Sequence, residues 1–143
     1  MEIQNILATK GPEVITIKPD ETLREAIALL SRFNIGGLVV VDDARRVIGI
    51  ITERDIIRQA AESEDLFARP IHDVMTTDVI VATPDDEVES VARTMTERHF
   101  RHLPIMDQGE LIGMVSIGDV VKAQRDQFRG EVDTLQTQMI EGC

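Results

Sequence analysis

The chain has 143 residues, of which 43% are hydrophobic and 29% charged, and its formal net charge is −11. This composition is typical of a soluble globular protein. The acidity argues against duplex nucleic acid or an anionic membrane as the main partner, because both bind broad basic surfaces. The single cysteine, Cys143, allows neither an internal disulfide nor a cysteine metal cage, and no segment resembles a signal peptide or a membrane span. We therefore expect a cytoplasmic protein whose ligand can still be a small anion.

The first elements follow an N-terminal arm, residues 1–12. The run Val14–Ile17 is β-branched and apolar, which predicts a short strand that ends at Pro19. A helix follows, because Thr22 and Glu25 have the spacing of a capping box ahead of an amphipathic stripe. The apolar residues of this stripe are Leu23, Ala26, Ile27 and Leu30.

The helix is expected to end near Asn34, and two strands come next. Leu38–Val41 reads as a buried strand, and Val47–Ile51 as its partner across the turn Asp42–Arg46. A second helix then starts at Thr52. The order of elements is therefore β-α-β-β-α.

The same unit occurs twice. Pro84 follows Pro19 by 65 residues, and the helical stripe returns at the same spacing as Val88, Val91, Ala92 and Met95. The second copy predicts a strand at Val79–Ala82, a helix ending near His99, strands at Leu103–Met106 and Leu111–Val115 around the turn Asp107–Glu110, and a last helix from Ser116. Such a repeat indicates two copies of one supersecondary unit, and the natural place for a ligand is between them.

Each copy is too small to bury its apolar face well by itself, so we expect both to pack into one core. The predicted fold is α/β (α+β), with two β-α-β-β-α repeats packed with pseudo-twofold symmetry. The expected segments are the arm 1–12, repeat 13–61, an acidic linker 62–77, repeat 78–124 and a C-terminal helix 125–143.

The C-terminal segment carries a heptad-like stripe, Phe128, Val132, Leu135 and Met139. It predicts a helix that docks on its own module or pairs with a second subunit. The stripe is too short to decide between the two.

The most informative polar motif is Gly-h-h-(Thr/Ser)-x-x-Asp, where h is apolar, and it occurs at Gly49–Asp55 and Gly113–Asp119. One interpretation is a helix N-cap, formed by Thr52 or Ser116 with an acid three residues later. The other is a ligand site, because a helix N-terminus attracts phosphate and a carboxylate can accept hydrogen bonds from ribose hydroxyls. Both interpretations can hold at once.

A second pair of motifs follows the first helix of each copy. Gly36-Gly37 precedes one strand, and Phe100-Arg101-His102 precedes the other. Two glycines let a flat ring approach the backbone, or they simply form a loop. Arg98, Arg101 and His102 make a local positive cluster in an acidic chain, which is either an anion site or a solvated patch.

These motifs together resemble a tandem pair of CBS domains, a Bateman module, from about Leu7 to Lys122. The resemblance rests on both Gly-h-h-(Thr/Ser)-x-x-Asp motifs, on the segments before Pro19 and Pro84, and on Arg101–Ile105. It is closest to small stand-alone bacterial proteins that contain little besides the pair. The resemblance implies a homodimer and a regulatory module that senses energy or redox state by binding adenine nucleotides.

The family resemblance also implies two clefts, in which the aspartate of one repeat holds ribose and the other repeat supplies the adenine pocket. The first would use Thr52, Arg54, Asp55, Met75, Thr76, Val79, Phe100, Arg101 and His102. The second would use Thr9, Lys10, Gly11, Ile35, Gly36, Gly37, Ser116 and Asp119.

The two clefts are expected to differ. Arg54 of the first corresponds to Gly118 of the second, and Arg101 and His102 correspond to glycines. We therefore expect the first to bind phosphate more strongly, while the second has more room beside the adenine and can use Lys10. The arginines favour AMP or NAD(H) over S-adenosylmethionine, and they also admit ATP and ADP.

An enzyme is not expected, because the sequence has no H-E-x-x-H, G-x-S-x-G or P-loop motif. Its histidines, His72, His99 and His102, lack metal-ligand spacing, so no metal is expected. The alternative function is a protein-interaction or dimerisation module with vestigial clefts. The sequence names neither the regulated partner protein nor the number of ligands per chain.

Overall fold

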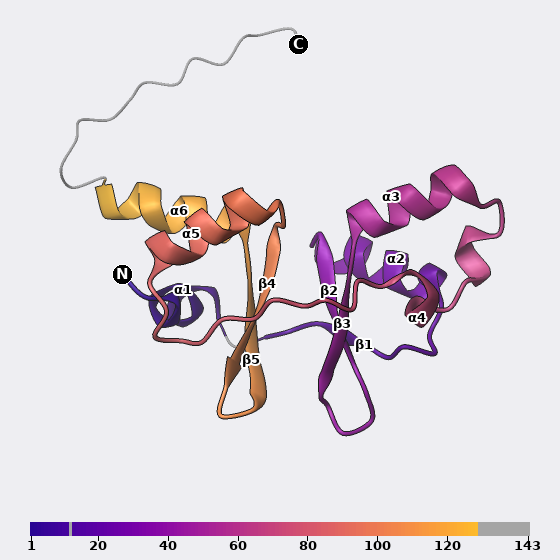
Figure 1. Ribbon diagram of the computed structural model, residues 1–143, viewed down its shortest axis with the longest axis horizontal. Coiled ribbons are helices and arrows are strands. Elements are labelled where there is room, and N and C mark those ends of the chain that lie inside the picture. The colour runs from indigo at the N-terminus through magenta and orange to yellow at the C-terminus, as the bar shows by residue number, and fades with distance from the viewer. Residues whose placement is uncertain (12, 129–143) are drawn as a thin grey trace, which may run out of the picture.

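Two similar halves lie side by side in the computed structural model, which describes residues 1–11 and 13–128 (Figure 1). Each half has a β-hairpin near the centre of the molecule and helices around it, so the predicted two-repeat α/β fold is confirmed. Along the chain the elements are α1 (Ile3–Lys10), β1 (Thr16–Ile17), α2 (Leu23–Phe33), β2 (Gly37–Val41), β3 (Val47–Thr52), α3 (Glu53–Glu62), η1 (Leu66–Ala68), α4 (Ile71–Val74), α5 (Val88–Arg98), β4 (His102–Asp107), β5 (Glu110–Ser116) and α6 (Ile117–Phe128).

The first half contains a three-stranded sheet in the order β1-β2-β3, in which β1 is parallel to β2 and β3 is antiparallel to it. Every residue of β2 is buried, as expected for a central strand. Thr22 caps α2 by accepting a hydrogen bond from the Glu25 amide at 3.4 Å. Asn34 ends the helix in the left-handed conformation, with φ 52°, and His99 ends α5 in the same way with φ 60°.

The second half contains only the antiparallel pair β4-β5 in its sheet. The predicted strand Val79–Ala82 is therefore wrong, since it is reduced to one parallel bridge between Ala82 and Ile105. Ala82 N donates to Pro104 O at 3.1 Å, and Ala82 O accepts from Met106 N at 2.8 Å. Pro104 has no N–H, so the ladder cannot continue toward residue 80.

The segment that precedes each repeat packs on the opposite half. Ile3 and Ile6 of α1 belong to the core formed by residues 82–120, and Ile71 of α4 belongs to the core formed by residues 17–51. Figure 1 shows α1 beside the β4-β5 hairpin and α4 on the side of β2-β3. The repeats thus exchange their leading segments.

The exchange is held by equivalent hydrogen bonds. Ile3 N donates to Asp86 O at 2.9 Å, and Ile71 N donates to Glu21 O at 2.8 Å. The acceptors are 65 residues apart and the donors 68, so the first leading segment is three residues longer than the second. Helix α1 correspondingly runs on to Lys10, whereas α4 ends after one turn at Val74.

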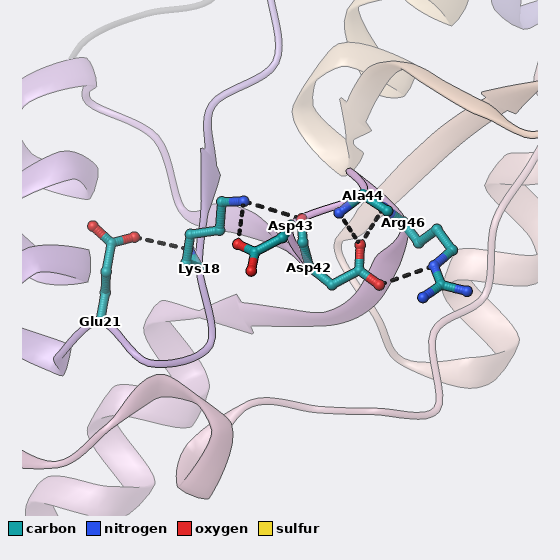
Figure 2. A network of polar contacts seen from close by, with 6 residues as sticks. All are labelled: Lys18, Glu21, Asp42, Asp43, Ala44 and Arg46. Carbon is teal, nitrogen blue, oxygen red and sulfur yellow. Dashed lines mark hydrogen bonds and ion pairs between the residues drawn. The ribbon is translucent and has the colours of Figure 1, made fainter.

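The turn between β2 and β3 is held by a polar network (Figure 2). Asp42 Oδ1 accepts from the amides of Ala44 and Arg46, both at 2.9 Å, and its Oδ2 pairs with Arg46 Nε at 2.9 Å. The Arg46 amide is the main reason why the pKa of Asp42 is lowered. Lys18 Nζ ties β1 to this turn by donating to Asp42 O and to Asp43 Oδ1.

Helix α6 is described as far as Phe128, so most of the C-terminal stripe lies outside the described residues. None of the helices in the described part of the chain has the length and apolarity that crossing a membrane requires.

Candidate functional site

A cleft of about 600 Å³ lies between the two halves. The end of β3 and the first turns of α3 form one wall, and the loop between α5 and β4 forms the other. Its lining residues are Ile50, Thr52, Glu53, Arg54, Asp55, Ile57, Arg58, Thr76, Arg98, His99, Phe100, Arg101 and His102.

Asp55 is fixed at the N-terminus of α3 by a capping box with Thr52. Its Oδ2 accepts from the Thr52 amide at 2.9 Å and from Thr52 Oγ1 at 3.1 Å. Thr76, which follows α4, donates from Oγ1 to Asp55 Oδ1 at 3.2 Å. The N-cap interpretation of this motif is correct, and the same carboxylate faces the cleft as a hydrogen-bond acceptor.

Arginines supply the positive charge of the cleft. Arg54 and Arg58 come from successive turns of α3, and Arg98 and Arg101 come from the opposite wall. Among residues 1–11 and 13–128 no carboxylate forms an ion pair with any of them, although Arg54 Nη1 donates to His99 O at 3.3 Å. A guanidinium has five donors, so this set can bind a multivalent oxyanion such as phosphate.

His102 lies where the two halves meet, with its ring against Gly36 and Gly37. A Cβ added to Gly36 would lie 3.0 Å from His102 Nε2, and one added to Gly37 would lie 3.0 Å from His102 Cγ. The glycines are therefore needed for this close approach. Burial lowers the pKa of His102, and Lys10 and Arg101 lower it further, against the opposing effects of Glu53 and Asp119.

The counterpart of Asp55 in the second repeat is Asp119, and its surroundings differ. Asp119 Oδ2 accepts from the Ser116 amide at 2.9 Å and from Lys10 Nζ at 2.7 Å. The same ammonium donates to Met114 O at 2.7 Å. Burial by itself would raise the pKa of Asp119, but the hydrogen bonds from Lys10 and Ser116 give a net lowering.

A second cavity, of about 450 Å³, lies between α1 and α6 rather than at the meeting of the halves. Asp119 is on its wall, together with Lys10 and Lys122. Its complete lining is Met1, Asn5, Ile6, Thr9, Lys10, Asp119, Lys122, Ala123 and Asp126.

The structure brings most of the residues of the first predicted cleft together. Thr52, Arg54, Asp55, Thr76, Phe100, Arg101 and His102 line the cavity. Met75 and Val79 are not in its lining, and a Cβ added to Gly49 would lie 2.6 Å from Met75 Sδ. Of the second predicted set, Thr9, Lys10 and Asp119 share the cavity beside α1, whereas Gly11, Ile35, Gly36, Gly37 and Ser116 do not line it.

The sequence interpretation left out several lining residues. Arg58 is the most informative, because it lies four residues after Arg54 and so shares a helix face with it. That spacing alone could have identified it. Glu53 and His99 had no such signal, because their position depends on how the halves pack.

Comparison with known proteins gives the family. The CBS domain matches two segments of this chain, residues 6–62 and 71–126. The chain spans 39% of the protein MJ1225 of Methanocaldococcus jannaschii, with which it is 41% identical over 109 residues.

Solved structures share the same fold. The CBS-domain containing protein ATU1752 from Agrobacterium tumefaciens is 35% identical with a TM-score of 0.82, and the match covers 86% of this chain and 92% of that one. The CBS domain pair of protein MJ0100, in complex with 5′-methylthioadenosine and S-adenosyl-L-methionine, is 27% identical with a TM-score of 0.80, covering 89% and 98%. CBSX2 in complex with AMP is 30% identical with a TM-score of 0.70, covering 81% and 90%.

These matches include both repeats and the exchange of their leading segments falls within them, so the duplicated architecture and the family matches agree. The chain belongs to the CBS-domain family as a tandem pair of CBS domains.

Proposed function

We propose that this CBS pair is a regulatory module that binds a phosphate-bearing adenine nucleotide in the cleft between its halves. Asp55 would accept hydrogen bonds from the ribose hydroxyls, and the four arginines of the cleft would bind the phosphates. The observation that carries the proposal is the convergence of arginines without ion-pair partners, in the described residues, on the cavity that also contains Asp55.

The relatives support adenosine as the shared part of the ligand. The CBS pair of MJ0100 was solved with two adenosine compounds and CBSX2 with AMP. Guanidinium groups match phosphate geometry and repel the sulfonium cation of S-adenosylmethionine. We therefore favour AMP or NAD(H), with ADP and ATP as further candidates.

The module would act by changing shape and not by catalysis. A nucleotide that contacts Arg54 on one half and Arg101 on the other would favour the arrangement in which both walls reach it. The resulting shift can be no larger than the difference in its affinity for the two arrangements. We propose that a partner protein, or the second subunit of a homodimer, responds to this shift in the cytoplasm.

A thermal-shift panel of AMP, ADP, ATP, NAD+, NADH and S-adenosylmethionine tests the proposal. A ligand present at 100 times its Kd stabilises the folded state by about 2.7 kcal/mol. For a chain of this size that corresponds to a rise in melting temperature of roughly 6–10 °C. We expect such a rise with a phosphate-bearing nucleotide and its loss in Asp55→Ala.

The matched control is Asp43→Ala, which removes an exposed acid from the β2-β3 turn and should leave the rise intact. Arg101→Gln should reduce the effect of AMP more than that of adenosine. A flat panel, on protein first shown to be free of co-purified nucleotide, would contradict the proposal. It would favour the alternative of an interaction module with vestigial clefts.

A further inference from the structure

We infer that the second CBS cleft is closed by the chain's own Lys10 and His102, so that each chain takes one nucleotide, in the first cleft. This inference rests on the proposed function. It goes beyond it by naming the residues that make the two halves of the pair unequal.

The carboxylates of the two clefts have different neighbours. Asp55 accepts hydrogen bonds from Thr52 and Thr76, which are small neutral groups that can rotate away. Asp119 instead pairs with the ammonium of Lys10, at 2.7 Å. Lys10 is also held by the carbonyl of Met114 at 2.7 Å, so it bridges α1 to the end of β5 and to α6. A ribose would have to displace this group before it could reach Asp119.

The opposite wall of the second cleft is also filled. Its adenine pocket would be formed by Gly36 and Gly37, but these glycines are covered by the ring of His102. His102 is within electrostatic range of both Lys10 and Asp119. The carboxylate and the ring platform that a nucleoside requires are therefore both in use.

The arrangement has an origin in the sequence. The leading segment of the first repeat is three residues longer than that of the second, and α1 continues to Lys10 where α4 stops at Val74. This extra turn carries Lys10 to Asp119. In the first cleft the shorter segment brings Thr76 to Asp55 instead.

Isothermal titration with AMP, and in parallel with NAD+, counts the sites. We expect one binding event per wild-type chain, which Asp55→Ala abolishes and Asp119→Ala leaves unchanged. The double variant Lys10→Met, His102→Gly should show two events, because Met keeps the apolar stem of Lys10 and Gly is the residue at the corresponding position of the first repeat, Gly37. The added event should disappear when Asp119→Ala is introduced.

The control is Lys122→Met, His102→Gly. It removes the same charge from the wall of the same cavity and makes the same change in the first cleft, but it leaves the pair of Lys10 with Asp119 in place. We expect it to keep a single event. Circular dichroism of each variant, with its melting temperature, establishes that it is folded.

Two events in the wild type, the weaker one lost in Asp119→Ala, would overturn the inference alone. A single event in the folded Lys10→Met, His102→Gly variant would also overturn it. No binding to the wild type would instead refute the proposed function, and the inference with it.

Discussion

Ile3 gives the most direct test of the exchanged segments. Its side chain is fully buried in the core of the second repeat, although it lies more than 75 residues before that repeat's first buried residue, Ala82. Changing a buried isoleucine to alanine costs 2–5 kcal/mol, because burial is lost and a cavity remains. We expect Ile3→Ala to reduce the free energy of unfolding by about 3 kcal/mol. The melting temperature should fall by roughly 10 °C.

The assay is urea unfolding followed by far-UV circular dichroism, since the chain has no tryptophan or tyrosine for fluorescence. Ile71→Ala makes the equivalent change in the other core and should have a similar effect, because Ile71 is also fully buried. Ile57→Ala is the control: this side chain is 68% exposed, so its loss should change stability by less than about 0.5 kcal/mol. If Ile3→Ala behaved like Ile57→Ala, the packing of α1 on the second repeat would be refuted.

Three further predictions concern titration and packing. The pKa of His102 is lowered by folding, so the unfolded chain takes up the proton first and stability should decline as the pH falls below about 6.5; His102→Gln should reduce this decline, measured by urea unfolding between pH 7 and 5, and His99→Asn should not. Gly49→Ala should destabilise by about 1–3 kcal/mol, because the new methyl would lie 2.6 Å from Met75 Sδ; an unchanged unfolding midpoint would contradict the packing. Gly118→Ala should stabilise by up to about 1 kcal/mol, because it meets nothing closer than 3.5 Å and favours helix; a lower midpoint would argue against this position being open.

Local patterns predicted most of the elements. The stripe starting at Leu23 and the β-branched run in β2 became a helix and a buried strand, because periodicity reports which face of an element is buried. The predicted strand at Val79–Ala82 failed for a reason that lies in another segment, the missing N–H of Pro104. Pairing depends on both strands, and a single run of residues describes only one.

The first candidate cleft could be predicted further than the second. Thr52 and Asp55 lie in one short motif, so their geometry is largely local. The contact of Lys10 with Asp119 joins residues that are 109 positions apart, and nothing in either motif announces it. The glycines at Gly36 and Gly37 were interpreted as a place for a flat ring. The structure puts such a ring there, that of His102, and a role toward adenine remains a prediction.

The exchange of leading segments bears on what happens if the chain is severed. A cut between residues 62 and 66 would leave an N-terminal fragment that carries α1 but lacks Ile71, and a C-terminal fragment that carries α4 but lacks Ile3. Each piece would expose the apolar groove that the other piece is shaped to fill. Neither should fold well in isolation, yet when mixed they should assemble into a two-chain complex. The CBS pair is therefore a natural candidate for fragment complementation, with the covalent linker dispensable and the reciprocal burial of two isoleucines serving as the joint.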